Sequence, residues 1–170
     1  MRVLVFLLIF LLIPFPALAW QSWQGRVVNV DDGDSITVLT PGNRQIRVRL
    51  YGIDCPERRQ AFGNRARQAT EKYVKGQTVE IQAMDIDSYE RTVAVVYLPS
   101  GNSLNELLIS EGLAWVYPQY CNVDFICDPL RRLEAAAKAG KRGLWADKNP
   151  VEPWNWRKQI RGAGNGSYYQ

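Results

Sequence analysis

Five short segments with alternating apolar residues constrain the fold of this chain more than any other feature. In each segment, apolar and mostly β-branched residues alternate with polar ones, which is the period-two pattern of a strand with one buried face. The segments cover residues 25–30, 34–39, 45–51, 78–84 and 91–98. Pro41-Gly42-Asn43 provides a turn between the second and third segments, so the first three predict an antiparallel meander.

Three helices are predicted around these strands. Apolar residues recur at helical spacing over residues 61–75, between the third and fourth strand segments. A capping box at residues 103–106 begins a second helix, and Asp128 followed by Pro129 marks the start of a third that runs to Ala139. This order of elements predicts an α+β fold, a five-stranded OB-type Greek-key β-barrel with about three helices.

The chain divides into three parts. Its 170 residues, 46% hydrophobic and 22% charged, suit one globular domain, which we place at residues 20–150. Residues 1–19 have the basic start, apolar run and small-residue cleavage pattern of a signal peptide. A membrane anchor is the alternative, but the uninterrupted apolar run of residues 3–13 is shorter than the roughly 20 residues that span a bilayer. Residues 151–170 form a Trp/Pro segment followed by a Gly-rich C-terminal tail.

We therefore expect an exported protein, periplasmic or secreted, that is a monomer without stable membrane association after signal cleavage. Export makes disulfides possible for a chain with three cysteines. Cys121 and Cys127 are the natural pair, and closing their short loop would stabilise the fold by about 2 kcal/mol. Cys55 is then a free thiol, and it is a weak candidate for a nucleophile because no histidine is available to activate it.

The chain has no histidine, which removes many kinds of enzyme from consideration. Ser-His-Asp and Cys-His triads, His-ligated zinc and proton transfer by imidazole are all excluded. Acid–base chemistry must use carboxylates, and a phosphate must be bound by Arg or Lys. Arg2 is the only charged residue among residues 1–19, so 20 basic and 17 acidic residues remain after cleavage, a net charge of +3 that is compatible with a polyanionic partner.

Two aspartates are predicted to converge at one end of the barrel. Strand parity places Asp34 on the inward face of the second strand, together with Ile36 and Val38. It places Asp54 on the inward face of the third strand, beyond Leu50. Antiparallel neighbours bring these two ends together, where two carboxylates would repel unless a hard divalent cation lay between them. The alternatives are that Asp34 is a turn residue and that Asp54 caps the end of a strand.

Further charged residues lie near these aspartates. Arg49 lies in the third strand and Glu57 in the loop that follows it, while Arg91 begins the fifth strand with inward parity. An inward arginine at the rim of a barrel needs an anion. The alternative is internal pairing of Arg91 with Asp87 or Glu90. Arg49 would then pair with Glu57.

Together these residues resemble the staphylococcal nuclease (thermonuclease) family, from about residue 25 to about residue 145. Three motifs match in order. Residues 30–35 resemble the family's DGDT segment, residues 49–57 its RLxGIDxPE segment, and residues 87–91 its DxYGR segment. Glu90 stands where the last motif usually has glycine. The combination is more specific than any one of the motifs.

The resemblance implies that residues 20–150 are a calcium-dependent nuclease domain that hydrolyses phosphodiester bonds of DNA and RNA with little sequence specificity. Two carboxylates and one backbone carbonyl would ligate Ca²⁺, one carboxylate would act as general base or position the attacking water, and two guanidinium groups would bind the scissile phosphate. The residues at these positions are Asp34, Asp54 and Cys55 for the metal, Glu57 for the water, and Arg49 and Arg91 for the phosphate.

Aromatic and basic residues suit a nucleic-acid substrate. Tyr89, Tyr117 and Tyr120 are suited to hydrogen bonds with phosphate or to stacking on bases, which favours single-stranded or locally open DNA and RNA. Residues 58–75 hold six basic residues and one acid, which fits a phosphate backbone but also a solvated helix face. Two other functions remain open, a non-catalytic OB-fold nucleic-acid-binding module and a secreted calcium-binding interaction domain. The first would not require three acids and two arginines together, and the second would leave both arginines unexplained.

Overall fold

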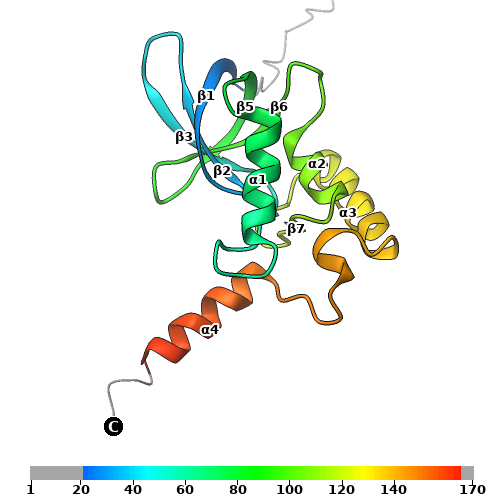
Figure 1. Cartoon of the computed structure of the whole chain (residues 1–170). Coiled ribbons are helices and arrows are strands. Elements are labelled where there is room, and N and C mark those ends of the chain that lie inside the picture. Colours follow the sequence, from blue (N-terminus) through cyan, green and yellow to red (C-terminus); the bar gives the residue numbers. More distant parts are fainter. Residues whose placement is uncertain (1–20, 166–170) are drawn as a thin grey trace, which may run out of the picture.

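The computed structural model describes residues 21–165, so the predicted signal peptide at residues 1–19 and the end of the predicted tail lie outside the described residues (Figure 1). Five strands form a closed barrel in the order β1-β2-β3-β6-β5. All neighbours are antiparallel except β3 and β6, which are parallel. The strands are β1 (Ser22–Asp32), β2 (Ser35–Leu39), β3 (Gln45–Leu50), β5 (Thr78–Ile86) and β6 (Thr92–Tyr97). The predicted α+β barrel is confirmed.

Four helices and a small second sheet complete the fold. Ser103 caps the second helix as predicted, because its side chain accepts a hydrogen bond from the Glu106 amide at 3.4 Å. One continuous core joins the barrel to the helices, with Ile36 and Val48 on the strands and Leu108 on the second helix all fully buried. The remaining elements are α1 (Gly63–Val74), α2 (Leu104–Ser110), α3 (Asp124–Ala139), a 3-10 helix (Gly143–Ala146), α4 (Pro153–Asn165), and the paired strands β4 (Ile53–Asp54) and β7 (Trp115–Val116).

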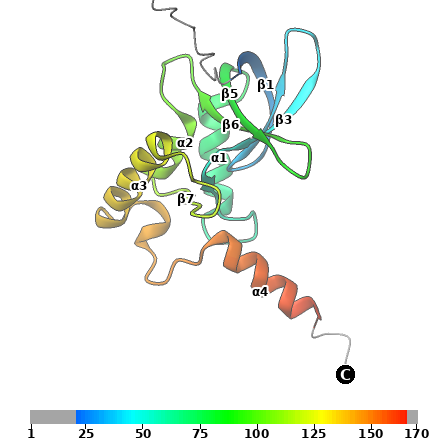
Figure 2. The ribbon, with the colours of Figure 1, turned by 180° about the vertical axis from the view of Figure 1, so that it is seen from behind.

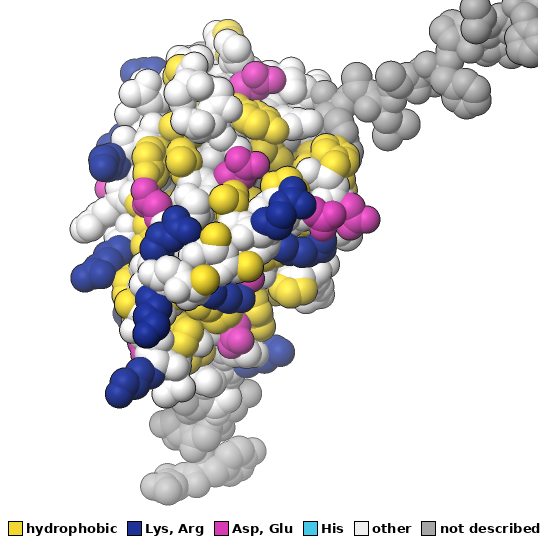
Figure 3. Space-filling model, turned by 90° about the vertical axis from the view of Figure 1, so that its right-hand side faces the viewer, with side chains coloured by type: hydrophobic (Ala, Val, Ile, Leu, Met, Phe, Trp, Pro, Cys, Tyr) yellow, Lys and Arg dark blue, Asp and Glu magenta, His cyan; other side chains and the backbone are white. Residues whose placement is uncertain are grey.

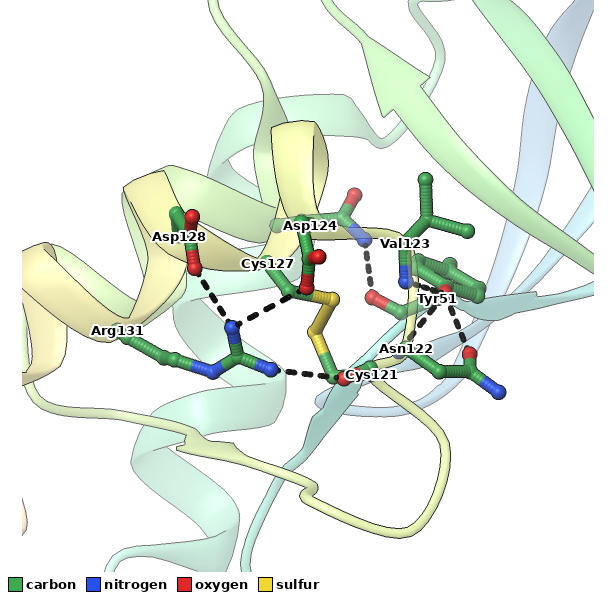
Figure 4. The surroundings of a disulfide bond; sticks show 9 residues. Tyr51, Cys121, Asn122, Val123, Asp124, Cys127, Asp128 and Arg131 are labelled. Atoms are coloured by element: carbon green, nitrogen blue, oxygen red, sulfur yellow. Dashed lines mark hydrogen bonds and ion pairs between the residues drawn. A yellow bond between two sulfur atoms is a disulfide. The ribbon is translucent and has the colours of Figure 1, made fainter.

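The third helix begins earlier than the sequence predicted. It starts at Asp124, whereas the sequence predicted Asp128 as the cap and Pro129 as the first helical residue, so Pro129 lies inside α3. The physical reason is the disulfide between Cys121 and Cys127, which ties the first turn of the helix to the loop before it (Figure 4). This covalent link helps to hold the five residues before Pro129 in helical conformation, against the usual preference for proline at a helix start.

Tyr51, directly after β3, fastens the same loop to the barrel (Figure 4). Its hydroxyl donates to the Asn122 side chain at 2.9 Å and accepts from the amides of Asn122 and Val123, each at 3.2 Å. Arg131 of α3 donates to the Cys121 carbonyl at 3.0 Å. The chain that leaves β3 toward β4 is therefore held against the start of α3.

The Trp/Pro segment, for which the sequence predicted no helix, forms α4. Pro153 stands at the first position of α4, where its fixed φ suits a helix and its missing N–H would have had no partner in any case. The amides of Asn155 and Trp156 donate to the Glu152 carbonyl at 3.0 and 2.9 Å. Figure 1 and Figure 2 show that α4 projects away from the barrel. None of the helices within residues 21–165 combines the length and apolar character needed to cross a membrane.

Asn105 of α2 connects the helices with the strand ends near the predicted site. Its buried side chain donates to the Tyr51 carbonyl at 2.9 Å and accepts from the Val96 amide at 3.2 Å. Both backbone groups are enclosed by the core, so they depend on this side chain for a partner.

We expect Asn105→Ala to lower the free energy of unfolding by about 2–4 kcal/mol, because two buried backbone groups lose their hydrogen bonds. Denaturation in urea measures the change. Asn102→Ala is the matched control, since the exposed side chain of Asn102 donates to the Ser100 hydroxyl on the surface. A similar, small effect of both substitutions would contradict the role given to Asn105.

Candidate active site

Asp34, Arg49 and Asp54 meet at one end of the barrel. Asp34 lies in the turn before β2, and Arg49 lies in the neighbouring strand β3. Asp54 does not continue β3, as parity predicted, because the chain turns at residues 51–52 and Asp54 lies in β4, which pairs with β7. Nη1 of Arg49 is 3.1 Å from Oδ2 of Asp34, and Nη2 is 2.7 Å from Oδ1 of Asp54. Asp34 is 6% exposed and Asp54 1%, so both ion pairs are shielded from solvent.

The backbone around Asp34 explains why these groups meet. Ser35 faces Arg49 in the β2–β3 ladder, and the Leu50 amide donates to the Asp34 carbonyl at 2.9 Å. The carboxylate of Asp34 also accepts a hydrogen bond from the Cys55 amide at 2.6 Å. The main chain on both sides of the β3–β4 turn therefore holds Asp34 in place.

Cys55 is the free cysteine, and it is buried. Burial raises the pKa of its thiol well above the usual range, and the neighbouring Asp34 carboxylate raises it further. A buried, protonated thiol is a poor nucleophile and is protected from oxidation. Within residues 21–165, the backbone amide of Cys55, and not its sulfur, forms the hydrogen bond that joins this residue to the site.

Asp32, at the end of β1, is a further carboxylate of this cluster that the sequence analysis did not single out. Burial is the largest cause that raises its pKa to about 6, and the charges of Asp34 and Glu57 add to it. Within residues 21–165, its buried Oδ1 atom has no hydrogen-bond partner. The acids at residues 31, 32 and 34 could have indicated a role for Asp32 in the sequence, but we interpreted this segment as a turn and as a motif around Asp34 alone.

Arg157 of α4 connects Glu57 with the cluster. Its Nη1 is 2.7 Å from Oε1 of Glu57, and its Nη2 is 2.7 Å from Oδ2 of Asp54. Although burial acts in the opposite direction, hydrogen bonds to these two carboxylates raise the pKa of the Arg157 guanidinium. Burial and the Asp34 charge raise the pKa of Asp54 to about 6, against the effect of its arginine partners. The partner of Glu57 is thus Arg157 and not Arg49.

Arg91 lies on the outer face of the barrel. The β3–β6 ladder pairs the fully buried Leu50 with Ala94, so the inward parity predicted for Arg91 is wrong. The same ladder pairs Arg49 with Val93, and strand alternation then places Arg91 on the face that carries Arg49.

Arg91 is held by Asp87, as the internal-pairing alternative proposed. Its Nη2 and Nε atoms are 2.7 and 2.8 Å from Oδ2 of Asp87. Within residues 21–165, no ion pair or hydrogen bond joins Arg91 to Asp34 or Asp54. Glu90, at the family's glycine position, has a φ of 59°, a left-handed conformation that costs a non-glycine residue about 1–2 kcal/mol.

The three tyrosines that were predicted to contact the substrate lie in two separate places. Tyr117 stacks on Trp154 of α4, with ring centroids 4.8 Å apart and planes 9° from parallel, and Tyr120 meets Tyr117 edge-on at 4.7 Å. Tyr89 lies in the turn between β5 and β6, with the Arg91 guanidinium 5.5 Å from its ring centroid. Tyr89 and Tyr120 are exposed, as a residue that contacts substrate must be.

Basic side chains do not gather into one patch on the face shown in Figure 3, where they are scattered among acidic and apolar ones. On α1, Arg67 and Lys75 both pair with Glu71 at 3.0 Å. Arg65 packs over the Phe62 ring at 5.0 Å. These contacts engage part of the basic charge of residues 58–75, which favours the solvated helix face as the interpretation of that segment.

Comparisons with known proteins agree with this fold. The family model described as staphylococcal nuclease homologue matches residues 47–147. An "uncharacterized endonuclease" of Haemophilus influenzae is 42% identical over 135 residues, which cover 79% of this chain and 72% of that protein. A "micrococcal nuclease" of Shigella flexneri is 40% identical over 156 residues, covering 86% and 87%, and "Protein ParB" of Escherichia coli is 39% identical over 150 residues, covering 83% and 82%. An OB-type barrel with acids and arginines at one end is the class that this structure defines, and the chain belongs to the staphylococcal nuclease family.

In the presence of a chelator, we expect Asp32→Asn to stabilise the protein at pH 7 by about 1–2 kcal/mol. The pKa of Asp32 is raised from 3.8 to about 6, so the folded protein disfavours the charged form of this side chain more than the unfolded chain does. Charge on Asp32 therefore opposes folding. The gain from Asn should therefore be small at pH 4, grow as the pH rises from about 4 to about 6, and stay constant above that.

Urea unfolding of the wild type and of Asp32→Asn, each at pH 4 and at pH 7, measures this effect. Asp31→Asn removes the same charge from the exposed neighbouring residue and should bring no gain. A destabilised Asp32→Asn protein at pH 7 would show that the Asp32 carboxylate is not under electrostatic strain.

Proposed function

We propose that this chain is a calcium-dependent nuclease that hydrolyses phosphodiester bonds of DNA and RNA with little sequence specificity. The observation that carries the proposal is the junction of Asp34, Arg49 and Asp54 at one end of the barrel, to which Arg157 joins Glu57. Membership of the staphylococcal nuclease family supports it, and relatives of that family bear the names endonuclease and micrococcal nuclease.

The acidic cluster suits a hard divalent cation. Asp34 and Asp54 offer carboxylate oxygens, the ligands that Ca²⁺ prefers, and Asp32 adds a buried oxygen without a hydrogen-bond partner. Among the residues that the structure describes, no three acidic or cysteine side chains form a ready metal site, so we propose two side-chain ligands with the Cys55 backbone carbonyl as the third. Bound calcium would supply Lewis-acid polarisation of the phosphate.

Arg49 and Arg91 are proposed to bind the scissile phosphate and to offset the negative charge that grows in the transition state. A guanidinium group matches phosphate oxygens with two parallel hydrogen bonds. Asp87 engages the Nε and Nη2 atoms of Arg91, so Nη1 remains for a phosphate oxygen while Asp87 fixes the orientation of the side chain. This contact therefore positions Arg91 and leaves part of its guanidinium group free to donate hydrogen bonds.

Glu57 is proposed to accept a proton from the attacking water or to position it. Its side chain is 34% exposed, so water can reach it, whereas Asp54 at 2% is enclosed. A carboxylate is the available base because the chain has no histidine.

The substrate is proposed to be single-stranded or locally open nucleic acid. Tyr117 and Tyr120 beside α4, and Tyr89 beside Arg91, offer aromatic surfaces for bases. We propose that the chain acts as a monomer after export to the periplasm or the medium. Its Cys121–Cys127 disulfide supports an oxidising compartment.

We expect Glu57→Ala and Arg91→Ala each to lower the rate of single-stranded DNA hydrolysis by roughly 100-fold or more. The far-ultraviolet circular dichroism spectrum should not change, because both side chains lie outside the core. Glu80→Ala and Arg26→Ala remove the same charges from exposed strand positions and should leave the rate unaltered. Full activity in either site variant would refute the role assigned to that residue.

Calcium removal tests the metal requirement. Residues 20–170 should hydrolyse single-stranded DNA with added calcium, stop in a chelator, and recover when calcium is supplied in excess. Asp34→Ala should lose the calcium-dependent activity, and Asp31→Ala should retain it. A chain that binds DNA without ever cleaving it would be a binding module, and one that binds calcium alone would be an interaction domain. Either result would reject the nuclease proposal.

A further inference from the structure

Arg157 places a guanidinium group among the acids proposed to hold calcium. Oδ1 of Asp54 accepts hydrogen bonds from Arg49 at 2.7 Å and from Arg157 at 3.3 Å, and Oδ2 accepts one from Arg157 at 2.7 Å. Glu57 accepts a further bond from Arg157 at 2.7 Å. Arg157 is therefore the partner of Oδ2 of Asp54 and of Glu57 at the same time.

A cation bound to Asp54 would lie next to this guanidinium. Calcium approaches carboxylate oxygens to about 2.3–2.6 Å, close to the distance that the Arg157 nitrogen keeps from the same oxygen. Asp54 is 1% exposed, so little water lies between the two positive charges to screen their repulsion. Each cation weakens the hold of the other on Asp54.

Within the described residues, only the first turn of α4 is attached to the rest of the protein, which allows Arg157 to move away from Asp54. Pro153 is buried and Trp154 is half-buried against Tyr117, so the first turn of the helix is docked. From Lys158 onward the described side chains are exposed through Gly162, and the helix projects from the body in Figure 1 and Figure 2. Arg157 thus marks the boundary between the docked turn and a free part, and such a boundary opens at low free energy.

We propose that Arg157 is an internal counter-ion that occupies Asp54 and Glu57 in the metal-free protein and is displaced when calcium binds. It thereby lowers the affinity of the site for the ion and couples ion binding to release of α4. The inference rests on the proposed function, because it takes the same acids as the calcium site. The helix lies beyond residues 47–147, the part that the family model matches. Coupling is reciprocal, so if calcium loosens the hold of Arg157 on Asp54, removal of Arg157 strengthens calcium binding.

Calorimetric titration of calcium chloride into residues 20–170, without nucleic acid, tests the inference. Arg157→Gln should bind calcium roughly tenfold more tightly than the wild type. Arg157→Lys keeps the charge but loses the forked contact, and its affinity should lie between the two. Arg161→Gln is the matched control, because it removes the same charge one helical turn later, where the side chain donates to the Arg157 carbonyl. Its affinity should equal that of the wild type.

Hydrogen exchange of the α4 amides provides a second measurement. Calcium should accelerate exchange over residues 157–162 in the wild type, and Arg157→Gln should exchange rapidly there even without calcium. Circular dichroism verifies that each variant is folded, and Arg157→Lys replaces Arg157→Gln if the latter is not.

The two measurements separate failure of this inference from failure of the proposed function. Equal calcium affinities of Arg157→Gln, Arg161→Gln and the wild type would overturn the inference and leave the calcium site standing. Unchanged exchange of α4 in the wild type on addition of calcium would also overturn it. Absence of calcium binding in the wild type and in every variant would reject the calcium site and the inference together.

Discussion

The buried bridge from Asp34 through Arg49 to Asp54 is the interaction on which the site depends. Two carboxylates so little exposed cannot both stay charged without a positive group between them, and Arg49 supplies it at 3.1 and 2.7 Å. Removing one partner of a buried ion pair typically costs about 3–5 kcal/mol, since the other charge is left uncompensated. The bridge therefore ties the turn before β2, the end of β3 and β4 into one unit.

Backbone contacts hold this unit in place. The amides of Leu50 and Cys55 bind the carbonyl and the carboxylate of Asp34, and Asn105 of α2 binds the Tyr51 carbonyl between them in the chain. Each of these contacts is buried or lies at the edge of the core, so solvent and salt weaken it little. The helical layer thus contributes to the geometry of a site that the barrel carries.

The carboxylates of the site lie close enough together, and are buried enough, to disfavour their charged forms. The pKa values of Asp32 and Asp54 are both raised to about 6, with burial as the largest cause. Electrostatic strain of this kind is typical of places where a protein binds an ion or performs chemistry. In our proposal calcium relieves it when bound, and Arg157 relieves part of it in the metal-free protein.

Local patterns in the sequence were sufficient for the barrel and for most of the acids. Alternating residues gave the strands, the capping box at residues 103–106 gave the start of α2, and Asp34 and Asp54 do meet as expected, although Asp54 reaches the site from β4 of the second sheet and not from the end of β3. These features depend on neighbours in the chain or on a period of two, both of which are visible in the sequence. Parity failed for Arg91 because it shows which residues share a face but not which face is buried.

The remaining features were decided by tertiary structure. The start of α3 lies ahead of Pro129, where the disulfide ties the first turn of the helix to the preceding loop, and α4 forms in the Trp/Pro segment for which no helix was predicted. Arg157 reaches Asp54 across 103 residues of chain, and no spacing or motif connects the two positions. By itself the sequence determined the barrel and the acids that lie at its end, because short-range periodicity encodes them. Only the folded chain decided which cation faces those acids, because that depends on how a distant helix packs.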